Sequence, residues 1–243
     1  MQLTQHLADY VRACFSGVWI ESSEHQDAIL EVAQLCHREG WEFVEWNIEQ
    51  GLSTSPDQAS SVTDPLAAVR AANEGSDPDA VRLIVLTNLH RYLGSAEIVQ
   101  AISHQLHLGK QNRTTLIILA PLTQLPSELE KLFVVLQHDL PDSVQLEEIA
   151  RGIATEETEI PPPEDFSRIL ESAAGLTRIE AENAFALSLV RHGVLRADVV
   201  WEHKAQALRK SGLVGLHAGA ECFDQLGGLN NLKSFCLRLM DHV

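Results

Sequence analysis

The order of apolar and polar positions predicts alternating helices and strands over the first 140 residues. Apolar side chains recur at helical spacing from Leu3 to Cys14, and two continuous apolar runs, 81–86 and 114–119, are typical of strands buried on both faces of a sheet. The expected helices cover 3–14, 24–39, a segment from 64 onward and 95–108; the expected strands cover 17–21, 41–48, 81–86, 114–119 and 132–137, the last as a third buried strand. This alternation indicates a mainly parallel, three-layer α/β fold.

The pattern changes after Pro141, where only helical periodicity continues. The predicted helices cover 163–174, 177–192 and 196–210, preceded by an acidic, proline-rich linker at 156–165. We therefore expect an α/β domain over residues 1–141 and a small helical bundle over 142–212. Earlier in the chain, residues 51–63 are rich in Ser, Thr, Pro and Asp and predict a surface loop.

Charge and composition exclude several classes of protein. The chain has 34 acidic and 18 basic residues, a formal net charge of −16, which disfavours binding to a phosphate backbone. It has no uninterrupted apolar run long enough for a membrane span, and its start lacks the features of a secretory signal. The four cysteines show no CxxC spacing, so free, mostly buried thiols are expected. A cytoplasmic protein fits these features.

The turn after the first predicted strand is where a nucleotide-binding αβ unit carries glycines and a lysine that hold phosphates. Here residues 21–27 read ESSEHQD, with no glycine or lysine, and the carboxylates of Glu21, Glu24 and Asp27 would face a polyphosphate. No GxxxxGK[ST] motif occurs in the chain. The buried strand 83–86 ends in Thr87 and Asn88, which are poor magnesium ligands. We expect no ATP binding of the usual kind.

Other candidate chemistry is sparse. His104 and His107 lie three residues apart on a predicted helix, a spacing that suits a metal pair, but no third ligand stands at a matching position. Solvated histidines are the alternative. Ser22 and His25 are close in sequence, yet the chain has no GxSxG motif. The sequence therefore predicts no catalytic residue and no metal site.

Several segments together resemble one family. Residues 140–142 (LPD) with Leu146, Ile149 and Ala150 are similar to the junction between an AAA+ α/β domain and its helical lid. Residues 126–131 (PSELEK) resemble the stretch after the sensor-1 strand, and 175–184 (GLTRIEAENA) the lid helix that carries sensor 2. Residues 210–213 (KSGL) and 223–233 (FDQLGGLNNLK) resemble the passage into a second, active AAA+ module. The chain thus resembles the N-terminal region of a bacterial and plastid AAA-type ATPase family, in which a degenerate AAA+-like domain precedes the active one.

The resemblance carries expectations for fold and site residues. It implies a degenerate P-loop-like α/β domain over 1–141, a lid-like domain over 142–212, and a linker over 213–243 into an ATPase module that this chain lacks. Arg178 would correspond to the sensor-2 cation, with an ordinary surface salt bridge as the alternative. Gly227 and Gly228 would lie beside the adenine of a downstream module. ATP and magnesium are implied for the family, and no cofactor for this chain.

Three functions are compatible with these features. The first is a non-catalytic module, inactive alone, that positions or regulates an AAA+ ATPase or binds a protein partner; the resemblance implies assembly into a ring. The second is a stand-alone interaction scaffold, a pseudo-ATPase without nucleotide. The third is a clamp-loader-like subunit that works on DNA, which the acidic charge disfavours.

Overall fold

The computed structural model describes residues 2–53, 62–74, 80–210 and 227–240. By compactness the chain forms two units: unit 1 contains Met1–Gly152 and Ala174–Asn183, and unit 2 contains Ile153–Ala173 and Ala184–Val243. Residues 213–226 and 241–243 of the predicted linker, and residues 211–213 of the motif at 210–213, lie outside the described residues. The described part of the predicted linker contains a helix, Asn230–Met240.

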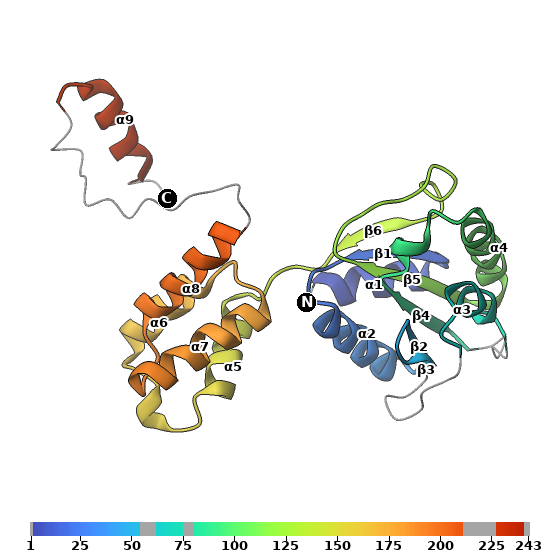
Figure 1. Ribbon diagram of the computed structural model, residues 1–243, viewed down its shortest axis with the longest axis horizontal. Helices are drawn as coiled ribbons and strands as arrows, with labels where there is room; N and C mark the ends of the chain where they lie inside the picture. Colours follow the sequence, from blue (N-terminus) through green and yellow to red (C-terminus); the bar gives the residue numbers. More distant parts are fainter. Residues whose placement is uncertain (1, 54–61, 75–79, 211–226, 241–243) are drawn as a thin grey trace. The chain divides into compact units, whose positions relative to one another are not determined.

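Unit 1 is built on a six-stranded sheet with the order β3-β2-β4-β5-β1-β6 (Figure 1). The strands are β1 (Gly17–Glu21), β2 (Glu42–Asn47), β3 (Gly51–Ser53), β4 (Arg82–Thr87), β5 (Thr114–Ala120) and β6 (Val134–Gln137). Every neighbouring pair is parallel except β2 and β3, which are antiparallel. The mainly parallel sheet expected from the sequence is confirmed.

Helices cover both faces of the sheet, because the central strands are apolar on both sides. On one face α1 (Gln2–Arg12) and α2 (His25–Glu39) pack over Val18, Ile20 and Val85; on the other, α3 (Pro65–Ala71) and α4 (Ala96–Asn112) pack over Trp19, Ile84 and their neighbours (Figure 1). Successive residues of one strand thus enter different cores. This gives the three layers that the sequence predicted.

Several helix boundaries follow from local signals. Asp64 caps α3 by accepting a hydrogen bond from the Ala67 N–H at 2.7 Å, and Pro65 occupies the first helical position. Gly40 ends α2 in the left-handed conformation. Arg113 ends α4 with a φ of 52°, and β5 begins at the next residue. The α4–β5 connection is therefore one residue long.

The structure corrects two strand predictions. Residues 51–53, taken as part of a loop, form β3, an edge strand that pairs with β2. Only three residues take part, too few to show an alternating pattern. The segment 132–137, expected to be a buried strand, contributes β6 at the other edge, where it pairs with β1 and leaves Val135 45% exposed. Residues 54–61 of the predicted loop lie outside the described residues.

The cysteine prediction holds only in part. Cys14, Cys36 and Cys236 are free thiols, but Cys14 is exposed and Cys36 is buried. Burial raises the pKa of the Cys36 thiol to about 12. Cys222 lies outside the described residues.

Unit 2 contains helical segments that bury a small apolar core. Helix α6 (Pro163–Ala173) packs against α8 (Ala197–Lys210), and the buried side chains include Phe166, Ile169, Phe185, Val199 and Val200. The buried hydroxyl of Ser188 donates to the Val194 carbonyl and accepts from the Arg196 N–H, so this polar group is satisfied. Helix α9 (Asn230–Met240), the 3₁₀ turn η2 (Glu157–Glu159) and the second half of α7 (Arg178–His192) also belong to unit 2, whereas α5 (Ser143–Ile153) and the 3₁₀ turn η1 (Leu89–Tyr92) belong to unit 1 except for Ile153.

Close approach between α4 and β5 requires a glycine at position 109. A Cβ placed there would overlap the carbonyl oxygen of Thr114 and contact Ser16 at 3.3 Å. We expect Gly109→Ala to lower the free energy of unfolding by about 1–3 kcal/mol through this overlap. Gly152→Ala is the matched control, because that helical glycine has nothing within 4 Å of its added Cβ and should gain roughly 0.5–1 kcal/mol. Urea unfolding followed by circular dichroism measures both, and equal effects would contradict the steric explanation.

Candidate functional site

A polar cluster lies at the carboxyl end of β1, where the chain turns into α2. The turn is held by Ser22, whose N–H donates to the Ala120 carbonyl and whose hydroxyl accepts from the Glu24 N–H, both at 2.9 Å. Ser22 and Glu24 are buried. Because β1 is flanked by β5 and β6, the turn opens at the same edge of the sheet as the ends of those strands.

His138 enters the cluster directly after β6. Its N–H donates to the Glu21 carbonyl at 2.9 Å, which extends the β1–β6 ladder by one residue. The ring Nδ1 lies 2.8 Å from the Ser22 hydroxyl, and Nε2 lies 3.9 Å from Oε1 of Glu31 on α2. Burial alone would lower the pKa of His138, but the neighbouring carboxylates of Glu31, Asp27 and Glu24 raise it above its ordinary value. The neighbouring His138 imidazole lowers the pKa of Glu31, against the opposing effect of burial.

Arg178 joins the first turn of α7 to this cluster within unit 1. Its Nε lies 2.9 Å from Oδ1 of Asp27, and its main-chain N–H donates to the Glu24 carboxylate. Glu24 therefore occupies the positive end of a helix, where a carboxylate is stabilised. Burial nevertheless raises the pKa of Glu24, and the hydrogen bond from the Arg178 N–H opposes the rise. One carboxylate of the turn thus accepts the main-chain N–H of Arg178, and a second forms an ion pair with its guanidinium.

The neighbouring end of β4 carries neutral groups. Asn88 adopts a left-handed conformation with a φ of 59°, and its N–H donates to the Leu119 carbonyl. The Thr87 hydroxyl, Nε2 of His25 and both ring nitrogens of His90 are buried without a hydrogen-bond partner in the described parts of the chain. Burial lowers the pKa of His25 and of His90, and Arg91 and His25 lower that of His90 further. Both shifts favour the neutral imidazole.

The arrangement suits a cation better than a polyphosphate. Asp27, Glu31 and His138 offer ligand atoms that all lie within 4.8 Å of one another, a spacing that a metal ion can close. A polyphosphate would meet Glu24 and Asp27 at the turn, with no lysine there to offset their charge. The one arginine present already pairs with Asp27.

The residues singled out in the sequence lie in different places. Arg178 belongs to the cluster, whereas Gly227 and Gly228 directly precede α9 in the other unit, and Gly228 has a φ of 74°. His104 and His107 are exposed on α4, with Nδ1 of His107 2.6 Å from the Ser103 carbonyl. The hydroxyl of Ser22 contacts His138 and not His25.

Sequence reasoning missed Glu31 and His138. One signal was available for His138: it directly follows a predicted parallel strand, so it had to emerge at the edge where the turn after residue 21 opens. Glu31 lies one helical turn after Asp27 and shares its face of α2.

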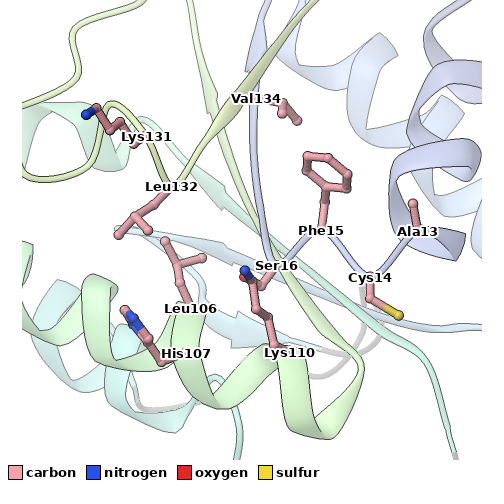
Figure 2. A pocket seen from close by; sticks show the side chains of 10 residues that line it. All are labelled: Ala13, Cys14, Phe15, Ser16, Leu106, His107, Lys110, Lys131, Leu132 and Val134. Carbon is pink, nitrogen blue, oxygen red and sulfur yellow. The ribbon is translucent and has the colours of Figure 1, made fainter.

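A second candidate is a cavity of about 200 Å³ at the opposite edge, near the start of β1 and β6 (Figure 2). Phe15, Leu106 and Leu132 give it an apolar wall, and Lys110 from α4 and Lys131 from the segment before β6 add positive charge. Its lining residues include no carboxylate.

Comparison with known proteins gives consistent matches along the chain. A family model described as the N-terminal domain of SpoVK-like AAA ATPases matches residues 3–138, and a model of their second domain matches 144–211. The chain is 22% identical over 195 residues to the uncharacterized AAA domain-containing protein ycf46 of Trieres chinensis, and 21% identical over 195 residues to that of Guillardia theta. These alignments cover 78% of this chain and 39% and 38% of the relatives. The chain thus spans about two fifths of the length of these curated relatives.

Among solved structures, PCH-2 of C. elegans has a similar fold. The TM-score is 0.54 at 9% identity, and the match covers 86% of this chain and 68% of that one. At this identity the likeness concerns the fold alone.

The Asp27–Arg178 pair is expected to stabilise unit 1 because Asp27 is largely buried. In a double-mutant cycle of Asp27→Asn and Arg178→Gln, we expect a coupling energy of about 1–2 kcal/mol. This is smaller than for a fully buried pair, because the Arg178 side chain is 34% exposed and water screens its charge. Urea unfolding in buffer with EDTA measures it. The Arg12–Glu39 pair, at 2.7 Å but with Arg12 56% exposed, is the control and should couple by less than about 0.5 kcal/mol. Equal coupling energies in the two cycles would contradict the prediction that burial of Asp27 strengthens its interaction with Arg178.

Proposed function

The chain belongs to the SpoVK-like AAA ATPase family, and from this we propose that it is a non-catalytic N-terminal module of such an ATPase. Residues 1–141 would form its degenerate AAA+-like domain, 142–212 its lid-like domain, and 213–243 a linker toward an ATPase module. Its role would be to position or regulate that module, or to bind a protein partner.

The observation that carries the proposal is the β1–α2 turn. In P-loop ATPases this turn exposes backbone N–H groups and a lysine to the phosphates. Here the Glu24 carboxylate accepts the N–H of Arg178, and Asp27 pairs with the Arg178 guanidinium at 2.9 Å. The place that phosphates would take is filled by the protein's own carboxylates, and a polyphosphate would have to displace them against their charge.

The end of β4 supports the same proposal. ATPases of this kind place acidic residues there to hold magnesium through water. Thr87 and Asn88 are neutral at this position, and the buried imidazoles of His25 and His90 nearby are neutral as well. AAA ATPases as a family use ATP and magnesium, but the residues at this edge do not fit a magnesium nucleotide, so we derive no hydrolytic step for this chain.

The wider context favours a module over a stand-alone scaffold. The curated relatives are more than twice as long as the part that this chain matches. In the described parts of the chain, no helix is both long and apolar enough to cross a bilayer. Members of the AAA family commonly assemble and bind proteins; for this chain, ring assembly, a protein partner and a cytoplasmic location belong to the proposal. Arg178 would act as a structural cation that ties α7 to the turn, and Gly227 and Gly228 would approach the adenine of a downstream module.

Nucleotide binding tests the proposal directly. With the purified chain, titration of fluorescent ATP in the presence of magnesium should show no saturable binding up to about 1 mM, the upper end of the usual range of enzyme KM values. An active P-loop ATPase in the same assay serves as the positive control, and a cooperative melting curve shows that the chain is folded. Magnesium-dependent affinity in the micromolar range would overturn the proposal.

The positioning role requires a longer protein. If the coding sequence continues in frame into a GxxxxGK[ST] motif, substitution of that lysine should abolish ATP hydrolysis by the full-length protein. Arg178→Gln in the same protein should change the hydrolysis rate or the assembly state while leaving nucleotide binding intact. A coding sequence that stops without such a motif would instead favour the stand-alone interaction scaffold.

A further inference from the structure

Three side chains of the cluster have the composition of a transition-metal site. Asp27 and Glu31 project from consecutive turns of α2, and His138 reaches them from the end of β6. Their ligand atoms lie within 4.8 Å of one another, and the side chains of His138, Asp27 and Glu31 are 5%, 14% and 21% exposed. The set therefore combines proximity with partial burial and includes an imidazole.

His138 is oriented as metal-binding histidines are. Such a histidine commonly donates its second ring N–H to a fixed oxygen, which sets the tautomer and aims the other nitrogen at the ion. Here Nδ1 lies 2.8 Å from the hydroxyl of Ser22, which is itself fixed by the Glu24 N–H. In the tautomer that donates to Ser22, Nε2 presents its lone pair to the carboxylates. Nε2 is 3.9 Å from Glu31, longer than a hydrogen bond, so an ion could take this lone pair without breaking a short hydrogen bond to Glu31.

The local charge also favours a cation. Glu24, Asp27 and Glu31 place three carboxylates around His138, and Arg178 contributes one guanidinium. With His138 neutral, these groups sum to a net negative charge that a divalent ion would offset. Asp27 does not have to release Arg178, because a carboxylate has two oxygens and can serve both.

We propose that Asp27, Glu31 and His138 bind a divalent transition-metal ion, with Zn²⁺ as the fitting species. One imidazole and two carboxylates match zinc, whereas magnesium and calcium prefer oxygen ligands alone. Zinc bonds of about 2.0–2.2 Å bring ligand atoms to roughly 3.4 Å from one another. The ligand atoms that lie farthest apart, within 4.8 Å of one another, would therefore approach by at most about 1.4 Å. Side-chain rotation on α2 supplies this movement. Water completes the coordination.

The ion would join α2 to the end of β6, two elements that are far apart in the sequence. It should therefore stabilise unit 1 whether or not the full protein hydrolyses ATP, and the inference is independent of the proposed function. The effect that the test measures is on the stability of unit 1, through the link between α2 and β6.

The test uses the full chain after EDTA treatment and its removal. Calorimetric titration with ZnCl₂ should show one high-affinity site per chain, and zinc should raise the melting temperature. Glu31→Gln keeps the size of a partly exposed side chain and should weaken zinc binding at least about tenfold. His138→Gln should weaken it at least as much, and circular dichroism checks that each variant is folded.

The double variant His104→Gln/His107→Gln is the matched control, because it removes two exposed imidazoles with helical spacing and should leave zinc affinity unchanged. Co²⁺ as a spectroscopic probe should give no thiolate-to-metal charge-transfer band, which separates this site from cysteine ligation. Absence of zinc binding would overturn the proposal. So would affinity that persists in both cluster variants, is lost in the control, or comes with a thiolate band.

Discussion

Burial of the central strands on both faces is the constraint on which the rest of unit 1 depends. The apolar runs of β4 and β5 cannot face water on either side, so α1 and α2 must cover one face and α3 and α4 the other. Parallel strands with helical crossovers then bring all their carboxyl ends to one edge. The turn after β1, the neutral residues after β4 and His138 after β6 meet there for that reason. The strand order and direction therefore bring these polar residues together, whatever their side-chain chemistry.

At this edge the turn after β1 carries carboxylates where a phosphate site would carry positive charge. Glu24 accepts the main-chain N–H of Arg178, and Oδ1 of Asp27 lies 2.9 Å from the Arg178 Nε. The chain shares its family and its fold with AAA ATPases, so its function has to be argued from the side chains at this edge.

Sequence alone was sufficient where a pattern extends over many residues. The buried runs at 81–86 and 114–119, the helices between them and the family resemblance are confirmed. The sequence was insufficient where a strand pairs through few residues or where the contacting residues lie far apart in the chain. Three residues of β3 carry no periodic signal, and the edge position of β6 depends on which strand it joins. The partners of Arg178 and the approach of His138 to Ser22, 116 residues away, depend on the folded sheet.

The strand order also has a consequence for synthesis of the chain. In the described parts of the chain strand β1 pairs with β5 and β6, and Gly17 stands opposite Leu116, about 100 residues later. While the ribosome makes this intervening stretch, at roughly 5–20 residues per second, both edges of this apolar strand lack their partners. For those seconds α1 and α2 are the available cover for one of its faces. Unpaired edges of an apolar strand promote aggregation, and β1 carries this hazard until β5 and β6 have been made.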